Sequence, residues 1–99
     1  MAYYRVKNLR GTGDNFPRNS ATWIEHWEKH AGKRAGYCHA SDCLEFGRDG
    51  LVGAHVQLCD APNRHQYIVP LCHRCNHRND EFIVVGPLVP VNENLSVLW

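Results

Sequence analysis

Two pairs of cysteines constrain the fold of this chain more than any other feature. Cys38 and Cys43 form the first pair, and Cys72 and Cys75 form the second. Each pair is short enough for both sulfur atoms to bind the same ion, and four thiolates are the closed tetrahedral set that structural Zn²⁺ prefers. We therefore predict one structural zinc site made of these four residues, with the chain between the pairs closed into a loop by the metal.

Histidines near the cysteines leave alternative ligands open. The first pair has the wider spacing, so His39 could replace one of its cysteines, and His73 and His77 are weaker candidates. Five cysteines without an export signal favour a reducing compartment and metal ligation over disulfides, although disulfide pairing remains the alternative. Cys59 is the cysteine left over, and because it follows an apolar run we expect a buried, inert thiol.

The length and hydropathy pattern predict a single domain over residues 1–99. A chain of this size buries a modest share of its surface, so a metal would help it to fold. No apolar run approaches the ~20 residues of a membrane helix, and the first residues lack the apolar segment of a secretory signal. We therefore expect a cytoplasmic protein without a membrane partner.

The charge balance does not indicate a protein that binds DNA by charge alone. The formal net charge is +1, whereas domains that rely on charge have pI values above ~9. The basic residues are concentrated in the first 40 positions, where they could form a local basic face; the alternative is a scattered, solvated surface. The candidates for this face are Arg5, Lys7, Arg10, Arg18, Lys33 and Arg34.

The chain between residues 20 and 31 carries the signals of an N-terminal helix. Thr22 and Glu25 fit a capping box, and Gly32 is a suitable stop. His26 and His30 lie four residues apart and could share a metal ion. We favour a solvated helix face for them, because the residue after His26 is not the glutamate of a metalloprotease helix.

Alternating and apolar runs predict the remaining elements. A short strand is expected at Tyr3–Val6, and two extended runs at 51–58 and 67–71. Pro70 restricts the second run to a sheet edge or a strand end. A short helix is expected from Cys72 to about Glu81. A strand at 82–85 and an extended tail form the C-terminal segment, 82–99.

The fold expected from this order is a small α+β domain. A cysteine turn, two strands and a CxxC that opens a helix form the layout of a treble-clef zinc finger (a β-hairpin plus a short helix). Here the N-terminal helix and an additional C-terminal strand are added to it. Backbone N–H groups at the start of a helix can donate to thiolate sulfur, which suits a zinc site there.

Two segments resemble the HNH endonuclease group. They are GAHV at 53–56 and YIVPLCHRCNH at 67–77, and the resemblance extends over about 36–80. Members of this group share a ββα-metal core, often on a four-cysteine treble clef. The resemblance implies that His55 is the general base that activates water and that Asn76 completes the site for a divalent metal.

Several positions depart from the HNH pattern. Ala54 stands where an acid is usual, and the middle asparagine position falls near Gln66 or Tyr67, with Asn63 an imperfect substitute. His77 is one residue out of place. Mg²⁺ requires oxygen ligands, and Asp60 is the acid that could supply one. These departures favour a domain that keeps the scaffold and has lost catalysis.

Three functions follow as hypotheses. The first is a module that binds DNA or RNA through its basic half, with Arg74 and Arg78 as further contacts. The second is an active nuclease with His55 as base and a divalent ion such as Mg²⁺. The third is a protein-interaction module, a homodimer or a heteromer, that docks through the apolar segments 82–88 and 95–99; the alternative is that these segments pack on the chain's own helix.

Overall fold

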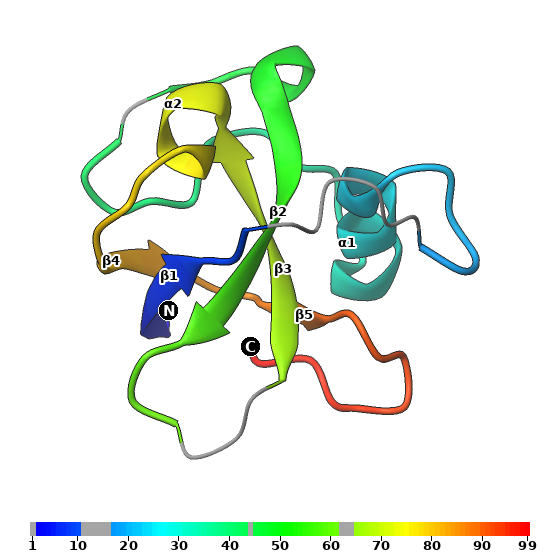
Figure 1. Ribbon diagram of the computed structural model, residues 1–99. Helices are drawn as coiled ribbons and strands as arrows, with labels where there is room; N and C mark the ends of the chain where they lie inside the picture. Colours follow the sequence, from blue (N-terminus) through cyan, green and yellow to red (C-terminus); the bar gives the residue numbers. More distant parts are fainter. Residues whose placement is uncertain (1, 11–16, 44, 62–64) are drawn as a thin grey trace.

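A five-stranded antiparallel sheet organises the chain (Figure 1). The computed structural model describes residues 2–10, 17–43, 45–61 and 65–99, and within these ranges the sheet has the order β4-β1-β2-β3-β5 and is accompanied by two short α-helices. The elements in chain order are β1 (Tyr3–Asn8), α1 (Trp23–Ala31), a 3₁₀ turn (Arg48–Gly50), β2 (Leu51–Leu58), β3 (Gln66–Cys72), α2 (His73–Asn76), β4 (Phe82–Val85) and β5 (Val89–Pro90). The fold is therefore a small α+β fold.

The N-terminal element of the fold is a strand, which corrects the description of the helix at 20–31 as N-terminal. The strand expected at Tyr3–Val6 forms and continues to Asn8. It lies between two partners, because Tyr3 is opposite Val85 on β4 and Val6 is opposite Leu58 on β2. Ladder hydrogen bonds on both sides fix β1 as an internal strand, and Val6 is fully buried at its centre.

The predicted hairpin is confirmed. β2 occupies the predicted range 51–58, and β3 exceeds the predicted run by one residue at each end. The two strands pair from Leu51↔Cys72 to Gln57↔Gln66. Pro70 lies beyond the short β5, which pairs only with Tyr67 and Ile68. The proline thus occupies a stretch of β3 with no second strand beside it, as a residue without an N–H requires.

Helix α1 begins and ends where its capping residues predict. The Thr22 side chain accepts a hydrogen bond from the Glu25 N–H at 3.3 Å, and Gly32 adopts the left-handed conformation with φ 72°. The helix starts directly against β2. A Cβ on Gly53 would lie 2.4 Å from the backbone carbonyl carbon of Trp23, so only glycine permits this approach.

Helix α2 is shorter than predicted. It comprises His73–Asn76 and does not continue to Glu81. Acidic residues are unfavourable at a helix C-terminus, and here Asp80 is drawn into a separate cluster. Arg78 donates to Asp80 at 2.7 Å and to Asp42 at 2.8 Å, which holds the chain against the first cysteine turn.

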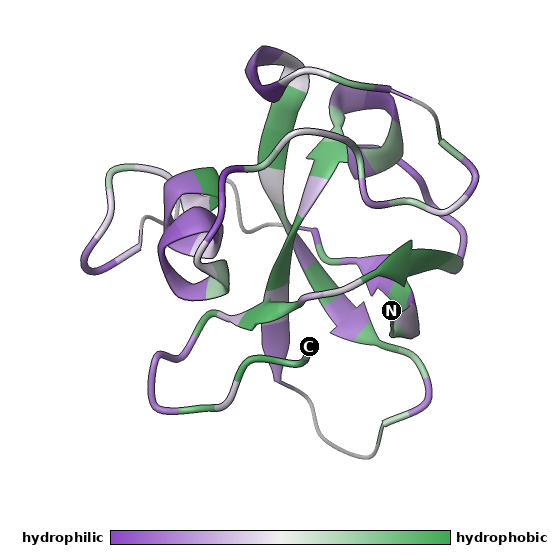
Figure 2. Cartoon of the chain, turned by 180° about the vertical axis from the view of Figure 1, so that it is seen from behind, coloured by the Kyte–Doolittle hydropathy of each residue, from purple (hydrophilic) through white to green (hydrophobic). Residues whose placement is uncertain are grey.

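The first half of the C-terminal segment is part of the core, whereas residues 91–99 are exposed or half-buried. Figure 2 shows β4 as an almost entirely hydrophobic strand, and Phe82, Val84, Leu88 and Val89 are buried. Trp99 is 65% exposed. The apolar side chains of 82–89 thus pack within the fold, and docking of a partner or a second copy through this segment stays a prediction. In the described ranges, no helix is long and apolar enough to span a membrane.

Candidate metal centre and the neighbouring cavity

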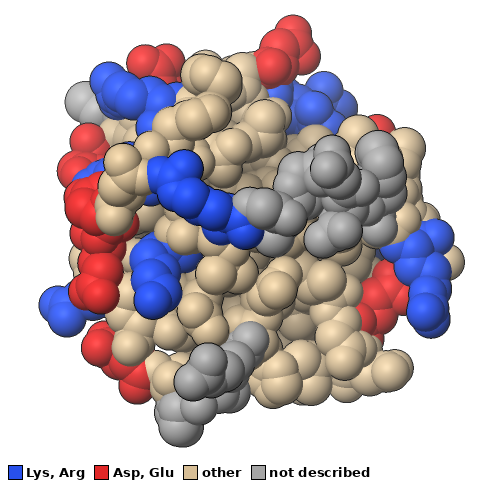
Figure 3. Space-filling model, viewed as in Figure 1, with Lys and Arg blue, Asp and Glu red and all other residues tan. Residues whose placement is uncertain are grey.

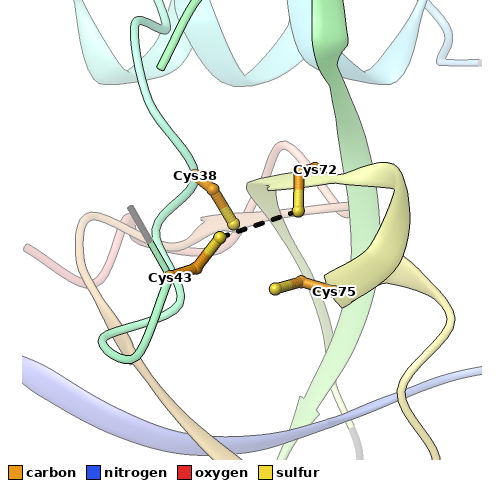
Figure 4. A group of neighbouring side chains, drawn as sticks. All are labelled: Cys38, Cys43, Cys72 and Cys75. Atoms are coloured by element: carbon orange, nitrogen blue, oxygen red, sulfur yellow. Dashed lines mark hydrogen bonds between the residues drawn. The ribbon is translucent and has the colours of Figure 1, made fainter. Parts of the chain in front are cut away.

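The four predicted ligands come together in one cluster. The sulfur atoms of Cys38, Cys43, Cys72 and Cys75 all lie within 4.8 Å of one another, and the side chains point toward a common centre (Figure 4). The Cys43 and Cys72 sulfurs are 3.7 Å apart. Two thiolates on a tetrahedral zinc at ~2.3 Å are separated by about 3.8 Å. The cluster is therefore consistent with a structural zinc site.

Two structural corners deliver these sulfurs. In the first corner a tight turn carries one pair, with the Cys43 N–H donating to the Ala40 carbonyl at 3.1 Å. This turn is tied to the sheet, because the His39 N–H donates to the Pro70 carbonyl at 2.9 Å. In the second corner Cys72 ends β3 and precedes α2, whose only turn carries Cys75. The hairpin thus brings both corners to the same end of the sheet.

The thiols have very different acidities without a cation. Burial raises the pKa of Cys38 to about 11 and also raises that of Cys75. Burial acts in the same direction on Cys43, but hydrogen bonds from the Glu45 backbone and from neighbouring thiols outweigh it and lower its pKa to about 7. Arg74 also donates to the Cys43 sulfur at 3.5 Å. Ionising all four sulfurs at neutral pH requires a positive ion among them, as a bound Zn²⁺ would provide.

The alternative ligands lie elsewhere. His39 is 1% exposed, donates from Nδ1 to the Val85 carbonyl at 2.8 Å and stacks on Tyr37, and burial lowers its pKa to about 4. His77 donates from Nδ1 to the His73 carbonyl at 2.7 Å. Neither is a member of the sulfur cluster. His39 is therefore a core residue.

The cysteines form no disulfide. All five are free, and the leftover Cys59 is half-buried. Burial and the neighbouring Glu81 carboxylate raise the pKa of the Cys59 thiol. The expected burial of Cys59 is thus only partial. A thiol with a raised pKa has little reactive thiolate at neutral pH, and its inertness stays a prediction.

His55 and Asn76, the two residues that the HNH resemblance singles out, line the same cavity. It has a volume of about 480 Å³ and lies where β1, β2, α1 and the end of α2 meet. The lining residues are Asn8, Leu9, Arg10, Trp23, Val52, Gly53, Ala54, His55, Asn76 and His77. The structure thus brings together residues that are far apart in the sequence.

The surroundings of His55 in this cavity favour the neutral form of its ring. Its side chain is 7% exposed, and the Trp23 ring meets it edge-on with centroids 4.8 Å apart. Burial, followed by the nearby His26, lowers the pKa of His55. Nε2 is buried and has no hydrogen-bond partner among the described residues. A neutral imidazole with an unpaired nitrogen can accept a proton or bind a ligand.

Asn8 is a cavity residue that the sequence did not reveal. Its Nδ2 donates to the carbonyls of Cys75 at 2.9 Å and Arg78 at 3.1 Å. Its Oδ1 is buried and, within the described part of the chain, has no partner. Asn8 therefore connects the cavity to the cysteine cluster and presents a second unsatisfied atom beside His55. Only the long-range pairing of β1 with β2 places it there.

The cavity has no carboxylate among its described lining residues. Ala54 lines it in the position where HNH proteins carry an acid. Asp60 follows the end of β2 and is not a lining residue, so it does not replace that acid. Gln66 and Tyr67 pair with Gln57 and Val56 in the hairpin. Asn63 lies outside the described residues.

Comparisons with protein-family models, with curated proteins and with solved structures gave no match. The HNH resemblance therefore depends on the residues at 53–56 and 67–77, of which His55 and Asn76 line the same cavity.

Proposed function

We propose that the chain is a zinc-stabilised, HNH-like treble-clef domain that binds nucleic acid and no longer catalyses the HNH reaction. The observation that carries the proposal is the cavity that His55 and Asn76 share without a carboxylate. The cysteine turn, the β2–β3 hairpin and the CxxC at the start of α2 support the treble-clef interpretation.

The absence of an acid supports loss of catalysis. Mg²⁺ requires several oxygen ligands, usually including carboxylates. The described lining offers the amide oxygens of Asn8 and Asn76 and the imidazole of His55. Without a firmly bound cation, the negative charge that develops on a phosphoryl group is poorly stabilised. The same polar atoms suit hydrogen bonding to a ligand.

The distribution of cations supports a nucleic-acid partner. In Figure 3, Lys and Arg atoms lie both between the centre and the left side of the face and at several points of its rim, whereas Asp and Glu atoms lie toward the rim. Arg10 is exposed and lines the cavity. Arg48 and Arg78 are engaged with carboxylates at 3.0 Å and 2.8 Å, so their charges are largely compensated. Arg10 is thus the cation best placed to contact phosphate beside the cavity.

Binding is tested with fluorescently labelled duplex DNA, single-stranded DNA and RNA, measured by anisotropy over a salt series. We expect binding at low salt that weakens steeply as salt rises. Arg10→Gln should lower the affinity and reduce the salt slope by about one. Lys29→Gln removes the same charge from an exposed position of α1 outside the cavity lining and serves as control. No binding of any probe at low salt would overturn the proposal.

The nuclease alternative is favoured by one observation, the shared cavity of His55 and Asn76. It is tested by incubating plasmid DNA with the protein and Mg²⁺, Mn²⁺ or Ni²⁺. Activity that disappears in a folded, zinc-containing His55→Ala variant would establish it. If the plasmid stays intact with every metal, this alternative is wrong and binding remains.

A further inference from the structure

A second group of metal-ligating side chains joins helix α1 to the segment after β5. It consists of His26, His30 and Glu93, with one ligand atom from each lying within 4.8 Å of the others. None of the four cysteines belongs to it. The helical spacing of the two histidines places them on one face, and the fold adds a carboxylate from the far end of the chain.

His26 presents an unpaired nitrogen to this group. Its Nε2 lies 3.0 Å from the Pro90 carbonyl, and since a carbonyl only accepts, Nε2 carries the proton and Nδ1 carries the lone pair. The residue is 1% exposed, and Nδ1 has no hydrogen-bond partner in the described structure. A backbone carbonyl that fixes the tautomer of a buried histidine is the usual support of a metal ligand.

Glu93 is held with one oxygen directed at the histidines. Its Oε2 accepts from Asn19 Nδ2 at 2.8 Å. Its Oε1 lies 3.4 Å from His30 Nε2 and 3.9 Å from His26 Nδ1. Two ligands of a tetrahedral zinc at ~2.05 Å are about 3.3 Å apart. Small side-chain movements would therefore bring all three atoms into coordination distance.

His26 Nδ1 and Glu93 Oε1 both carry lone pairs, and they lie 3.9 Å apart without a hydrogen bond between them. Such an arrangement is stabilised by a cation between them. Either a proton on Nδ1 or a metal ion supplies such a charge. A metal ion binds the neutral ring, and it would displace the proton that His30 Nε2 shares with Glu93.

We propose that His26 Nδ1, His30 Nε2 and Glu93 Oε1 form a second metal site, for a divalent transition ion of the Zn²⁺ class. Two imidazoles and one carboxylate leave a coordination position open, as in catalytic rather than structural zinc sites. The site is reachable from solvent, since His30 and Glu93 are each 28% exposed. Glu93 also lines a cavity of about 430 Å³ with Arg18 and Trp23, which gives a further ligand room to approach.

Cobalt binding to the protein loaded with one equivalent of zinc tests the site, because the four-cysteine cluster takes up this zinc first and the second site stays open. We expect one additional equivalent of Co²⁺, with visible d–d absorption but no thiolate-to-cobalt charge-transfer band. Glu93→Gln and His30→Gln should weaken this binding by at least about 100-fold, and Asn19→Ala by about 10-fold through loss of support. Glu25→Gln, the same change at an exposed residue of α1, should leave it intact.

A second measurement separates metal binding from loss of structure. In the wild-type protein, sub-stoichiometric Co²⁺ should broaden the ring resonances of His26 and His30 first. Broadening at His73 and His77 instead would overturn the proposal, since they are the other histidine pair with the same spacing. The absence of a second equivalent at millimolar Co²⁺, or equal affinity of wild type and Glu93→Gln, would overturn it as well.

Discussion

The cysteine cluster and the His55 cavity lie next to each other but are built in opposite ways. In the cluster, four side chains converge on one point and all of them are buried or nearly so. In the cavity, His55 Nε2 and Asn8 Oδ1 are buried without partners in the described structure. A closed set of ligands contributes to folding, whereas unsatisfied atoms beside open space are available to a ligand. The comparison supports the proposal that the cluster forms the scaffold and that the cavity is the place where a ligand binds.

The largest expected effect concerns the cluster. Cys75→Ser should unfold the domain, because apparent zinc-binding energies of ~10–16 kcal/mol match or exceed the ~5–15 kcal/mol stability of a typical domain. Circular dichroism and elemental analysis for zinc measure the outcome. Cys59→Ser is the matched control, since Cys59 lies outside the cluster, and it should change the stability by less than about 1 kcal/mol. If the Cys75→Ser protein folded normally in chelator, the cysteine cluster would not be needed for folding and would no longer differ in this respect from the His55 cavity.

The second effect concerns the wall of the cavity. Gly53→Ala should cost about 1–3 kcal/mol or more, because the new Cβ would lie 2.4 Å from the Trp23 backbone and α1 would have to move away from β2. Urea unfolding of the zinc-loaded protein measures it. Gly36→Ala is the control, since a Cβ there meets no atom within 4 Å. Equal effects of the two changes would show that α1 is not closely packed where the cavity is formed.

The third change tests the connection between the two regions. Asn8→Ala removes both side-chain hydrogen bonds to the carbonyls of Cys75 and Arg78 and should cost about 1–3 kcal/mol. It should also lower the affinity for nucleic acid at constant zinc content. Asn79→Ala, the same change at an exposed position outside the cavity lining, is the control for stability. If Asn8→Ala released zinc, the cavity and the cluster would form one structural unit.

Local chemistry made some of these features predictable. The short cysteine spacings indicated the metal cluster, Thr22 and Gly32 located α1, and the apolar runs located β2 and β3. These signals act between residues close in the sequence or rely on strong metal–ligand chemistry. The HNH-like segments also indicated His55 and Asn76, which share a cavity.

Long-range packing hid the remaining features. β1 pairs with both β2 and β4, and no local pattern states which strands an N-terminal strand will join. Asn8 enters the cavity only through that pairing. Glu93 similarly meets the two histidines of α1 because the chain after β5 returns to the helix. Helix α2 ends at Asn76, and Arg78 just beyond it binds Asp42, a contact between distant segments that the local sequence does not indicate.

The smallest expected effect is on the pH dependence of the unfolding free energy, to which the cavity residue His55 contributes. Burial, and then His26, lowers the folded-state pKa of His55, while the unfolded chain titrates near ~6.5. Below the unfolded-state pKa, the unfolded chain binds more protons than the folded protein. The stabilisation that requires a neutral His55 is therefore complete above the unfolded-state pKa, and it is lost as the pH falls toward the folded-state pKa. His55→Gln should therefore flatten the decline in unfolding free energy below neutrality, measured by urea unfolding with zinc content followed in parallel. His73→Gln, at an exposed position, should leave the decline unchanged. An unaltered slope in His55→Gln would mean that the cavity already solvates the imidazolium, and a binding site that depends on a neutral ring would then be excluded.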